Sequence, residues 1–138
     1  MPMRSAVAAA GQPIHQIFLP IGGAFLIGCL VTDLLYLTYV YVQWETFSDW
    51  LLTFGLVFAL VAFIAWLVDV FALKFRPAWP PFVAATAAAV LSLFNACIHS
   101  RDGYTAVAPS GVLLSAIVTL ILVLVAWNRW SLTHADAG

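Results

Sequence analysis

The sequence predicts an all-α protein, an integral membrane bundle of four transmembrane helices. Composition gives the first reason: of 138 residues, 64% are hydrophobic and 8% are charged, with a mean hydropathy of +1.05. So few charges cannot cover a water-soluble domain of this length. The second reason is that four apolar runs are long enough to cross a bilayer. The third is that Asp33 and Asp69 lie inside two of these runs, where a carboxylate is kept only if it faces protein or water.

The four predicted spans form one membrane domain, residues 1–138, with no second folded unit. Spanning roughly 30 Å of hydrocarbon takes about 20 helical residues. The runs that qualify cover residues 17–42, 51–73, 82–98 and 107–126. Pro20, followed by Gly22 and Gly23, gives the first span a place to bend. Prolines 77, 80 and 81 are expected to separate the second span from the third.

The positively charged side chains predict the orientation of the bundle. Arg101 falls on one side of the four-span arrangement, and the other four cations fall opposite it: Arg4, Lys74, Arg76 and Arg129. The positive-inside rule then places both termini in the cytoplasm. Tryptophans are expected at the membrane interfaces, outside for Trp44 and Trp50, and inside for Trp79, Trp127 and Trp130.

Several classes of function are disfavoured by the sequence. A net charge of −1 provides no basic patch, so nucleic acid is not an expected partner. Cys29 and Cys97 lie in apolar segments without a C-x-x-C spacing, so we expect neither a disulfide nor a metal site. No H-E-x-x-H, G-x-S-x-G or phosphate-loop motif is present. We therefore expect no independent catalytic activity, although the sequence does not decide the matter.

Polar side chains inside the spans fall into two groups when the helices are laid antiparallel. The outer group comprises Asp33, Tyr36, Asn95 and His99, and the inner group comprises Asp69 and His15. Asn95 and His99 share one helix face because they are four residues apart. Histidine titrates near neutrality, so an acid and an imidazole at the same depth could exchange a proton or hold a polar headgroup. The alternative is that the acids only keep the helices in register.

Haem is disfavoured as an internal cofactor. His15 and His99 are expected at opposite membrane faces, about 30 Å apart, so one iron could not bind both. Met1 and Met3 are terminal and offer no replacement ligand. A haem shared between the two chains of a homodimer is left open.

Several stretches taken together resemble the bacterial four-helix membrane family called domain of unknown function 2231. They are GQPIHQ at 11–16, LPIG at 19–22, VTDLL at 31–35, WLVD at 66–69 and the run from Asn95 to Gly111. The resemblance implies a multi-pass protein of the bacterial inner membrane, in a family without an established activity. Some similar sequences are joined to Rieske-type iron–sulfur domains, which implies redox or quinone chemistry nearby. The chain lacks a histidine common in the family near residues 80–81, and the usual glycines and histidine after the fourth span.

These observations lead to three competing expectations about function. The first is an accessory or anchoring subunit for a membrane or periplasmic redox protein, with quinone as a candidate ligand. Its outer-loop contacts would include Arg101, Asp102 and Tyr104. The second is a proton-coupled transporter or channel, working as a dimer, in which Asp33 and Asp69 act as successive proton sites. The third is a purely structural membrane protein.

Overall fold

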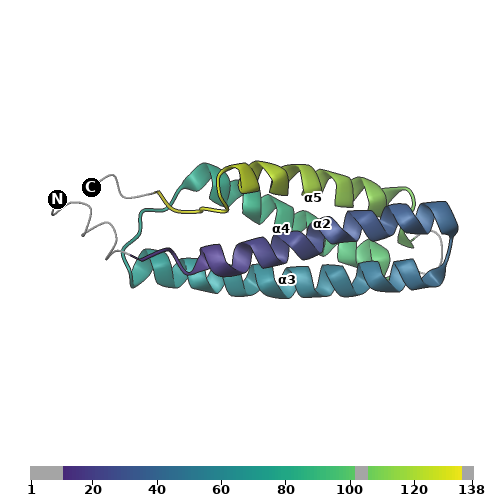
Figure 1. The fold of residues 1–138 in the computed structure, drawn as a ribbon, viewed down its shortest axis with the longest axis horizontal. Helices are drawn as coiled ribbons and strands as arrows, with labels where there is room; N and C mark the ends of the chain where they lie inside the picture. Colours follow the sequence, from purple (N-terminus) through teal and green to yellow (C-terminus); the bar gives the residue numbers. More distant parts are fainter. Residues whose placement is uncertain (1–10, 102–105, 135–138) are drawn as a thin grey trace.

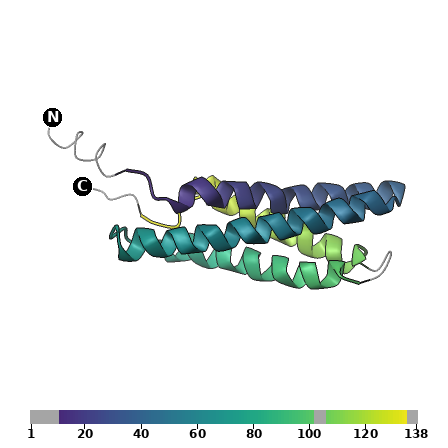
Figure 2. The same cartoon turned by 90° about the horizontal axis from the view of Figure 1, so that it is seen from below.

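Four long helices account for most of the computed structural model, which describes residues 11–101 and 106–134. They are α2 (His15–Tyr39), α3 (Val42–Phe71), α4 (Trp79–His99) and α5 (Ser110–Trp127). Each is long and apolar enough to cross a membrane. Successive helices run antiparallel, as Figures 1 and 2 show, which gives an up-and-down four-helix bundle. The prediction of an all-α bundle with four spans is confirmed.

The helix boundaries differ from the predicted spans most at the α2–α3 joint. The predicted first loop, after residue 42, is instead the start of α3, and only Val40 and Tyr41 connect the two helices. Val40 turns the chain in the left-handed region, with φ of 55°. The polar residues of this stretch read as a loop because they interrupt the apolar run. In the structure most of them project outward from a helical turn, whereas Ser48 is fully buried.

The prolines between the second and third spans also behave differently from the prediction. Pro80 and Pro81 lie in the first turn of α4. Backbone N–H groups form no hydrogen bond within the helix at these positions, so proline is tolerated there. Pro20 lies within α2, and the helix is continuous from His15 to Tyr39.

The helices α2 and α3 make the closest contact of the bundle. Gly22 and Gly55 face each other there: a Cβ added at Gly22 would lie 3.2 Å from the Gly55 carbonyl oxygen and from the Ala59 nitrogen. Small residues permit such close approach when lipid supplies no hydrophobic drive for association. α2 also packs against α5, and α4 packs against α5 and α3, so the four helices form a closed ring of neighbours.

The segment after α5 turns back across the end of the bundle where the described chain begins. Arg129 and Trp130 both adopt φ of 56°, which reverses the chain. The Ala78 N–H then donates to the Leu132 carbonyl at 2.9 Å, and the His134 N–H donates to the Arg76 carbonyl at 2.8 Å. The returning segment is thus tied to the connection between α3 and α4, and both ends of the described chain lie at the same end of the molecule (Figure 1).

Candidate functional site

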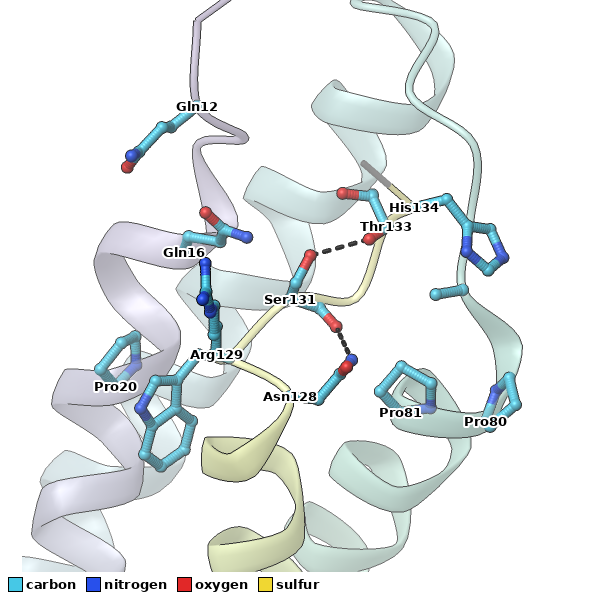
Figure 3. A pocket seen from close by; sticks show the side chains of 12 residues that line it. Gln12, Gln16, Pro20, Pro80, Pro81, Asn128, Arg129, Ser131, Thr133 and His134 are labelled. Atoms are coloured by element: carbon cyan, nitrogen blue, oxygen red, sulfur yellow. Dashed lines mark hydrogen bonds between the residues drawn. The ribbon is translucent and has the colours of Figure 1, made fainter. Parts of the chain in front are cut away.

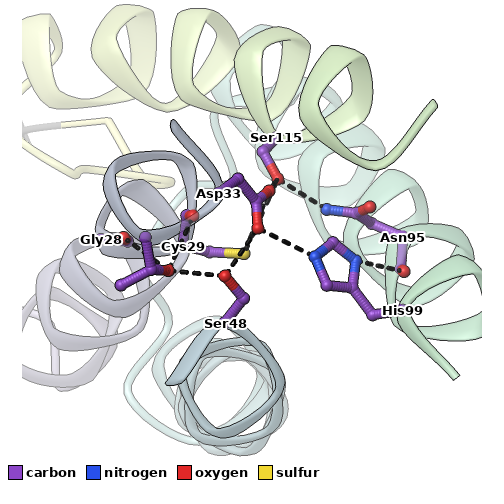
Figure 4. A network of polar contacts seen from close by, with 8 residues as sticks. Gly28, Cys29, Asp33, Ser48, Asn95, His99 and Ser115 are labelled. Atoms are coloured by element: carbon purple, nitrogen blue, oxygen red, sulfur yellow. Dashed lines mark hydrogen bonds and ion pairs between the residues drawn. The ribbon is translucent and has the colours of Figure 1, made fainter. Parts of the chain in front are cut away.

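The carboxylate of Asp33 is the point at which all four helices meet, as Figure 4 shows. Ser48 of α3 donates to its Oδ1 at 2.6 Å, and Ser115 of α5 donates to its Oδ2 at 2.6 Å. His99 of α4 places Nε2 2.9 Å from Oδ1. The Asp33, Ser48 and His99 side chains are all buried. We call Asp33, Ser48, His99, Ser115, Asn95 and Cys29 the outer cluster.

A second layer of contacts orients the groups that touch Asp33. Asn95 donates from Nδ2 to the Ser115 hydroxyl at 2.8 Å, and Thr32 contacts the Ser48 hydroxyl at 2.6 Å. The Cys29 thiol lies 3.8 Å from Oδ2 of Asp33. The Asn95 Oδ1 atom is buried without a hydrogen-bond partner among the described residues. The outer cluster is therefore almost fully hydrogen-bonded, as a polar group surrounded by apolar side chains must be.

The contacts of His99 fix where its protons lie. Its Nδ1 lies 3.1 Å from the backbone carbonyl oxygen of Asn95, which can only accept, so Nδ1 carries a hydrogen. Its Nε2 and the Asp33 carboxylate oxygen are both acceptors when unprotonated, so their 2.9 Å contact requires one proton between them. Asp33 and His99 therefore share a proton, either as an ion pair or as a neutral acid beside a neutral imidazole.

Space for the His99 ring comes from Gly111 in the first turn of α5. A Cβ added there would lie 3.0 Å from Cε1 of the ring and 2.8 Å from the Ala106 carbonyl oxygen. Tyr36 lies next to this region, packed with Ala106 and Val107 in a small buried cluster. The side chains of α2 and α4 thus meet beneath the connection between α4 and α5.

Asp69 at the other end of the bundle acts as a cap for α2. Its Oδ1 accepts the Ile14 N–H at 2.8 Å, and its Oδ2 accepts the His15 N–H at 3.0 Å and contacts His15 Nδ1 at 2.7 Å. These are N–H groups that a helix start leaves unpaired, and α2 has no side-chain cap of its own. A carboxylate at a helix N-terminus is also favoured by the helix dipole. We call Asp69, His15 and the Leu132 backbone the inner cluster.

His15 differs from His99 in its proton arrangement. The Leu132 N–H donates to Nε2 of His15 at 2.9 Å, so this nitrogen holds a lone pair. Nδ1 then carries the only ring hydrogen and donates it to Asp69. His15 is neutral in this arrangement, and its two ring nitrogens join α2, α3 and the returning C-terminal segment.

The family comparison covers both clusters. The model of the family described as "Predicted membrane protein (DUF2231)" matches residues 11–136. The chain belongs to the DUF2231 family. The resemblance seen in the sequence is therefore confirmed, and this DUF2231 member is an integral membrane protein with multiple spanning helices in contact with lipid. No curated protein and no solved structure matches the chain.

The structure of this DUF2231 member brings most of the sequence-predicted polar residues together. Asp33, Asn95 and His99 meet in the outer cluster, and Asp69 meets His15 in the inner one. Tyr36 is buried nearby. Of the expected outer-loop residues, Arg101 is exposed just after α4, whereas Asp102 and Tyr104 lie outside the described residues.

Sequence reasoning missed Ser48 and Ser115 as members of the site, and it considered Cys29 only as a residue without a disulfide or metal spacing. Ser48 was hidden because its stretch read as a loop. A signal was present for the inner cluster: the residues before α2, GQPI, include no Ser, Thr, Asp or Asn next to the first helical turn, so α2 needed an acceptor from elsewhere.

One set of side chains in this DUF2231 member could hold a metal ion, although the sequence predicted none. Ligand atoms of Cys29, Asp33 and His99 lie within 4.8 Å of one another. His99 already donates Nδ1–H to a backbone carbonyl, the arrangement that orients many metal-binding histidines. Thiolate, carboxylate and imidazole together suit a first-row transition metal, which would displace both the proton shared by Asp33 and His99 and the thiol proton of Cys29.

Proposed function

We propose that this DUF2231 member is an accessory or anchoring subunit that holds a redox protein at the bacterial inner membrane. The observation that carries the proposal is an apolar groove of about 510 Å³ between α3 and α4. Leu56, Leu60 and Phe63 contribute from α3, and Phe82, Val90 and Leu93 from α4.

The groove has the length and chemistry to receive the side chains on one face of a transmembrane helix of the partner. From Phe82 to Leu93 it follows α4 for about 16 Å, at 1.5 Å per residue, which is over half of a bilayer core of roughly 30 Å. Ala85 and Ala89 line it four residues apart, the small-xxx-small spacing that lets helices approach closely in lipid. α4 is also the least buried of the four helices, so it has the most surface left for a partner.

The two polar clusters support anchoring better than a proton pathway. Asp33 and Asp69 belong to separate clusters, and Asp69 lies beside His15. From His15 to Asp33 is eighteen residues of α2, or about 27 Å along the axis. The apolar cluster between these levels includes Leu26 and Leu52. Each carboxylate is also held by several donors, as expected of groups that fix a scaffold in one arrangement.

The redox character of the partner rests on the family resemblance, and quinone remains a candidate ligand in this proposal. An apolar groove open to lipid suits an isoprenoid tail as well as a helix side chain. Both occupants would place redox chemistry beside the bundle and leave the chain without catalytic activity of its own.

Filling the groove tests the proposal. The tagged full chain, or its Ala89→Trp variant, would be extracted from its native membrane in mild detergent. The extracts would be compared for co-purifying proteins and for their visible absorption spectra. We expect the wild type to retain a membrane protein with an iron–sulfur, haem or flavin spectrum, and Ala89→Trp to lose most of it. The matched control is Leu120→Trp, which adds the same ring at a side chain of α5 that is 68% exposed.

Three results would argue against the anchoring proposal. One is a co-purifying set that is identical for wild type and Ala89→Trp. Another is an associated protein without any redox chromophore. The last is a groove occupied only by a second copy of the chain, seen as a homodimer that Ala89→Trp dissociates.

A further inference from the structure

A polar pocket of about 690 Å³ lies at the end of the bundle where the described chain begins and ends (Figure 3). It is bounded by the start of α2, the start of α4 and the segment after α5. Its polar lining comprises Gln12, Gln16, Asn128, Arg129, Ser131, Thr133 and His134. Neither cluster described above accounts for this pocket.

The charge of the pocket indicates an anionic ligand. Arg129 contributes a permanent positive charge, and no described residue forms an ion pair with it. None of the described residues that line the pocket is acidic. A guanidinium group presents several N–H donors in the planar arrangement that matches the oxygens of a phosphate.

One buried atom of the lining has no partner and calls for a ligand. The Thr133 side chain is 4% exposed, and its Oγ1 forms no hydrogen bond within the described part of the chain. A buried hydroxyl without a partner is costly, and in native structures it is normally satisfied by water or by a bound group. Thr133 lines the same pocket as Arg129, so one phosphate could accept from both.

The depth of the pocket identifies the kind of phosphate. Trp79, which directly precedes Pro80 of the lining, is 58% exposed, and Trp127, two residues before Arg129, is 89% exposed. Tryptophans of membrane proteins are enriched at the level of the lipid headgroups. The pocket therefore opens in the layer that contains phospholipid phosphates.

We propose that this pocket binds the phosphate of an anionic phospholipid, with Arg129 as the charged contact and Thr133 as a hydroxyl donor. The positive charge of Arg129, which no described residue pairs, and the lack of acidic described lining residues favour an anionic lipid over a zwitterionic one. The bound lipid would join α2, α4 and the returning C-terminal segment through one headgroup.

Native mass spectrometry of the full chain in detergent tests the proposal. The probes are phosphatidylglycerol and phosphatidylcholine with identical acyl chains. We expect phosphatidylglycerol to bind at least tenfold more tightly than phosphatidylcholine. Arg129→Gln should reduce phosphatidylglycerol binding about tenfold, and Thr133→Val, which keeps the side-chain shape, about threefold. The matched control is Arg76→Gln, since Arg76 is exposed near the same end but does not line the pocket.

Each other outcome would overturn the proposal. Equal binding of the two lipids would remove the role of the headgroup charge. Unchanged binding by Arg129→Gln, or an equal loss in Arg76→Gln, would show that the lipid binds elsewhere. Calorimetric titration with inorganic phosphate provides a further arm, because phosphate binding that matches the lipid affinity would identify a soluble ligand.

Discussion

The two histidine–aspartate pairs of this protein consist of the same residue types but differ in which ring nitrogens carry a hydrogen. His15 receives a backbone N–H on Nε2, so its single ring hydrogen is directed to Asp69. His99 faces an acceptor with each nitrogen, so the second of its hydrogens is shared with Asp33. The two histidines therefore differ because of one backbone contact. The Leu132 N–H fixes the single ring hydrogen of His15 on Nδ1, whereas the proton between His99 and Asp33 can lie on either side chain.

Replacing Asp33 tests whether the outer cluster acts only as a structural element. Asp33→Asn keeps the size of the side chain but replaces one of the two oxygens that contact Ser48, Ser115 and His99 with an NH2 group, and it removes the proton shared with His99. We expect a loss of about 1.5–3 kcal/mol in the free energy of unfolding, the range for hydrogen bonds to charged groups. Asp49→Asn is the control, because Asp49 is exposed and should change stability by less than about 0.5 kcal/mol.

The same variant separates the scaffold from a transporter. Unfolding would be followed in detergent, and proton or solute flux would be followed in liposomes. A flux in the wild type that Asp33→Asn abolishes, with stability unchanged, would contradict the scaffold interpretation and support proton-coupled transport.

At the scale of elements, glycine sets the distance between α2 and α3. A Cβ added at Gly55 would lie 2.5 Å from Cδ2 and 2.7 Å from Cγ of Leu26, whose side chain is buried in the apolar core. At Gly28 an added Cβ would find its nearest atom, from Leu51, at 3.6 Å, which is an ordinary contact. Two glycines associated with one helix pair therefore differ sharply in their tolerance of a methyl group.

Alanine substitution at these two glycines checks the close packing. We expect Gly55→Ala to destabilise the bundle by about 1–3 kcal/mol, because overpacking forces Leu26 or the helices apart. Gly28→Ala should be neutral or stabilising, because alanine favours the helix and meets free space there. Thermal unfolding in one detergent measures both. Equal effects of the two substitutions would show that α2 and α3 do not pack through Gly55.

The sequence predicted the helices better than it predicted their ends. Apolar runs identify spans because lipid requires them, and all four were found. The start of α3 was missed because its 30 residues are more than a bilayer requires, so its first turns need no apolar residues and Glu45 and Asp49 resembled a loop. The start of α4 was missed because prolines are common both in the first turn of a helix and in loops, so the sequence alone does not distinguish the two positions.

The sequence predicted the members of the candidate site only where their position along the spans determined which side chains meet. Depth along antiparallel spans brought Asp33 to the level of His99, and Asp69 to the level of His15. The role of the Leu132 backbone could not be predicted, because every residue carries an N–H and sequence gives no sign of which one turns toward His15. The proton arrangement of each histidine depends on such contacts, so it required the structure.

On the scale of the whole molecule, the polar contacts that tie the ends of the described chain together lie at one end of the bundle. The inner cluster, the polar pocket with Arg129 and the returning C-terminal segment all lie there, next to Lys74 and Arg76. The opposite end carries Arg101 after α4. This asymmetry of positive charge determines how a multi-pass protein inserts, because cationic loops are retained on the cytoplasmic side.

Cysteine labelling tests the orientation that this asymmetry predicts. In a Cys97→Ser background, Lys74→Cys and Arg101→Cys place one exposed thiol at each end, while Cys29 stays buried and unlabelled. Cells with a permeabilised outer membrane would be treated with a membrane-impermeant maleimide. We expect labelling at position 101, and none at position 74 until the cells are lysed. Labelling at position 74 alone in unlysed cells would show that the bundle has the opposite orientation in the membrane. The pocket with Arg129 would then face the outer leaflet, and the partner of the groove would need a helix of the opposite orientation.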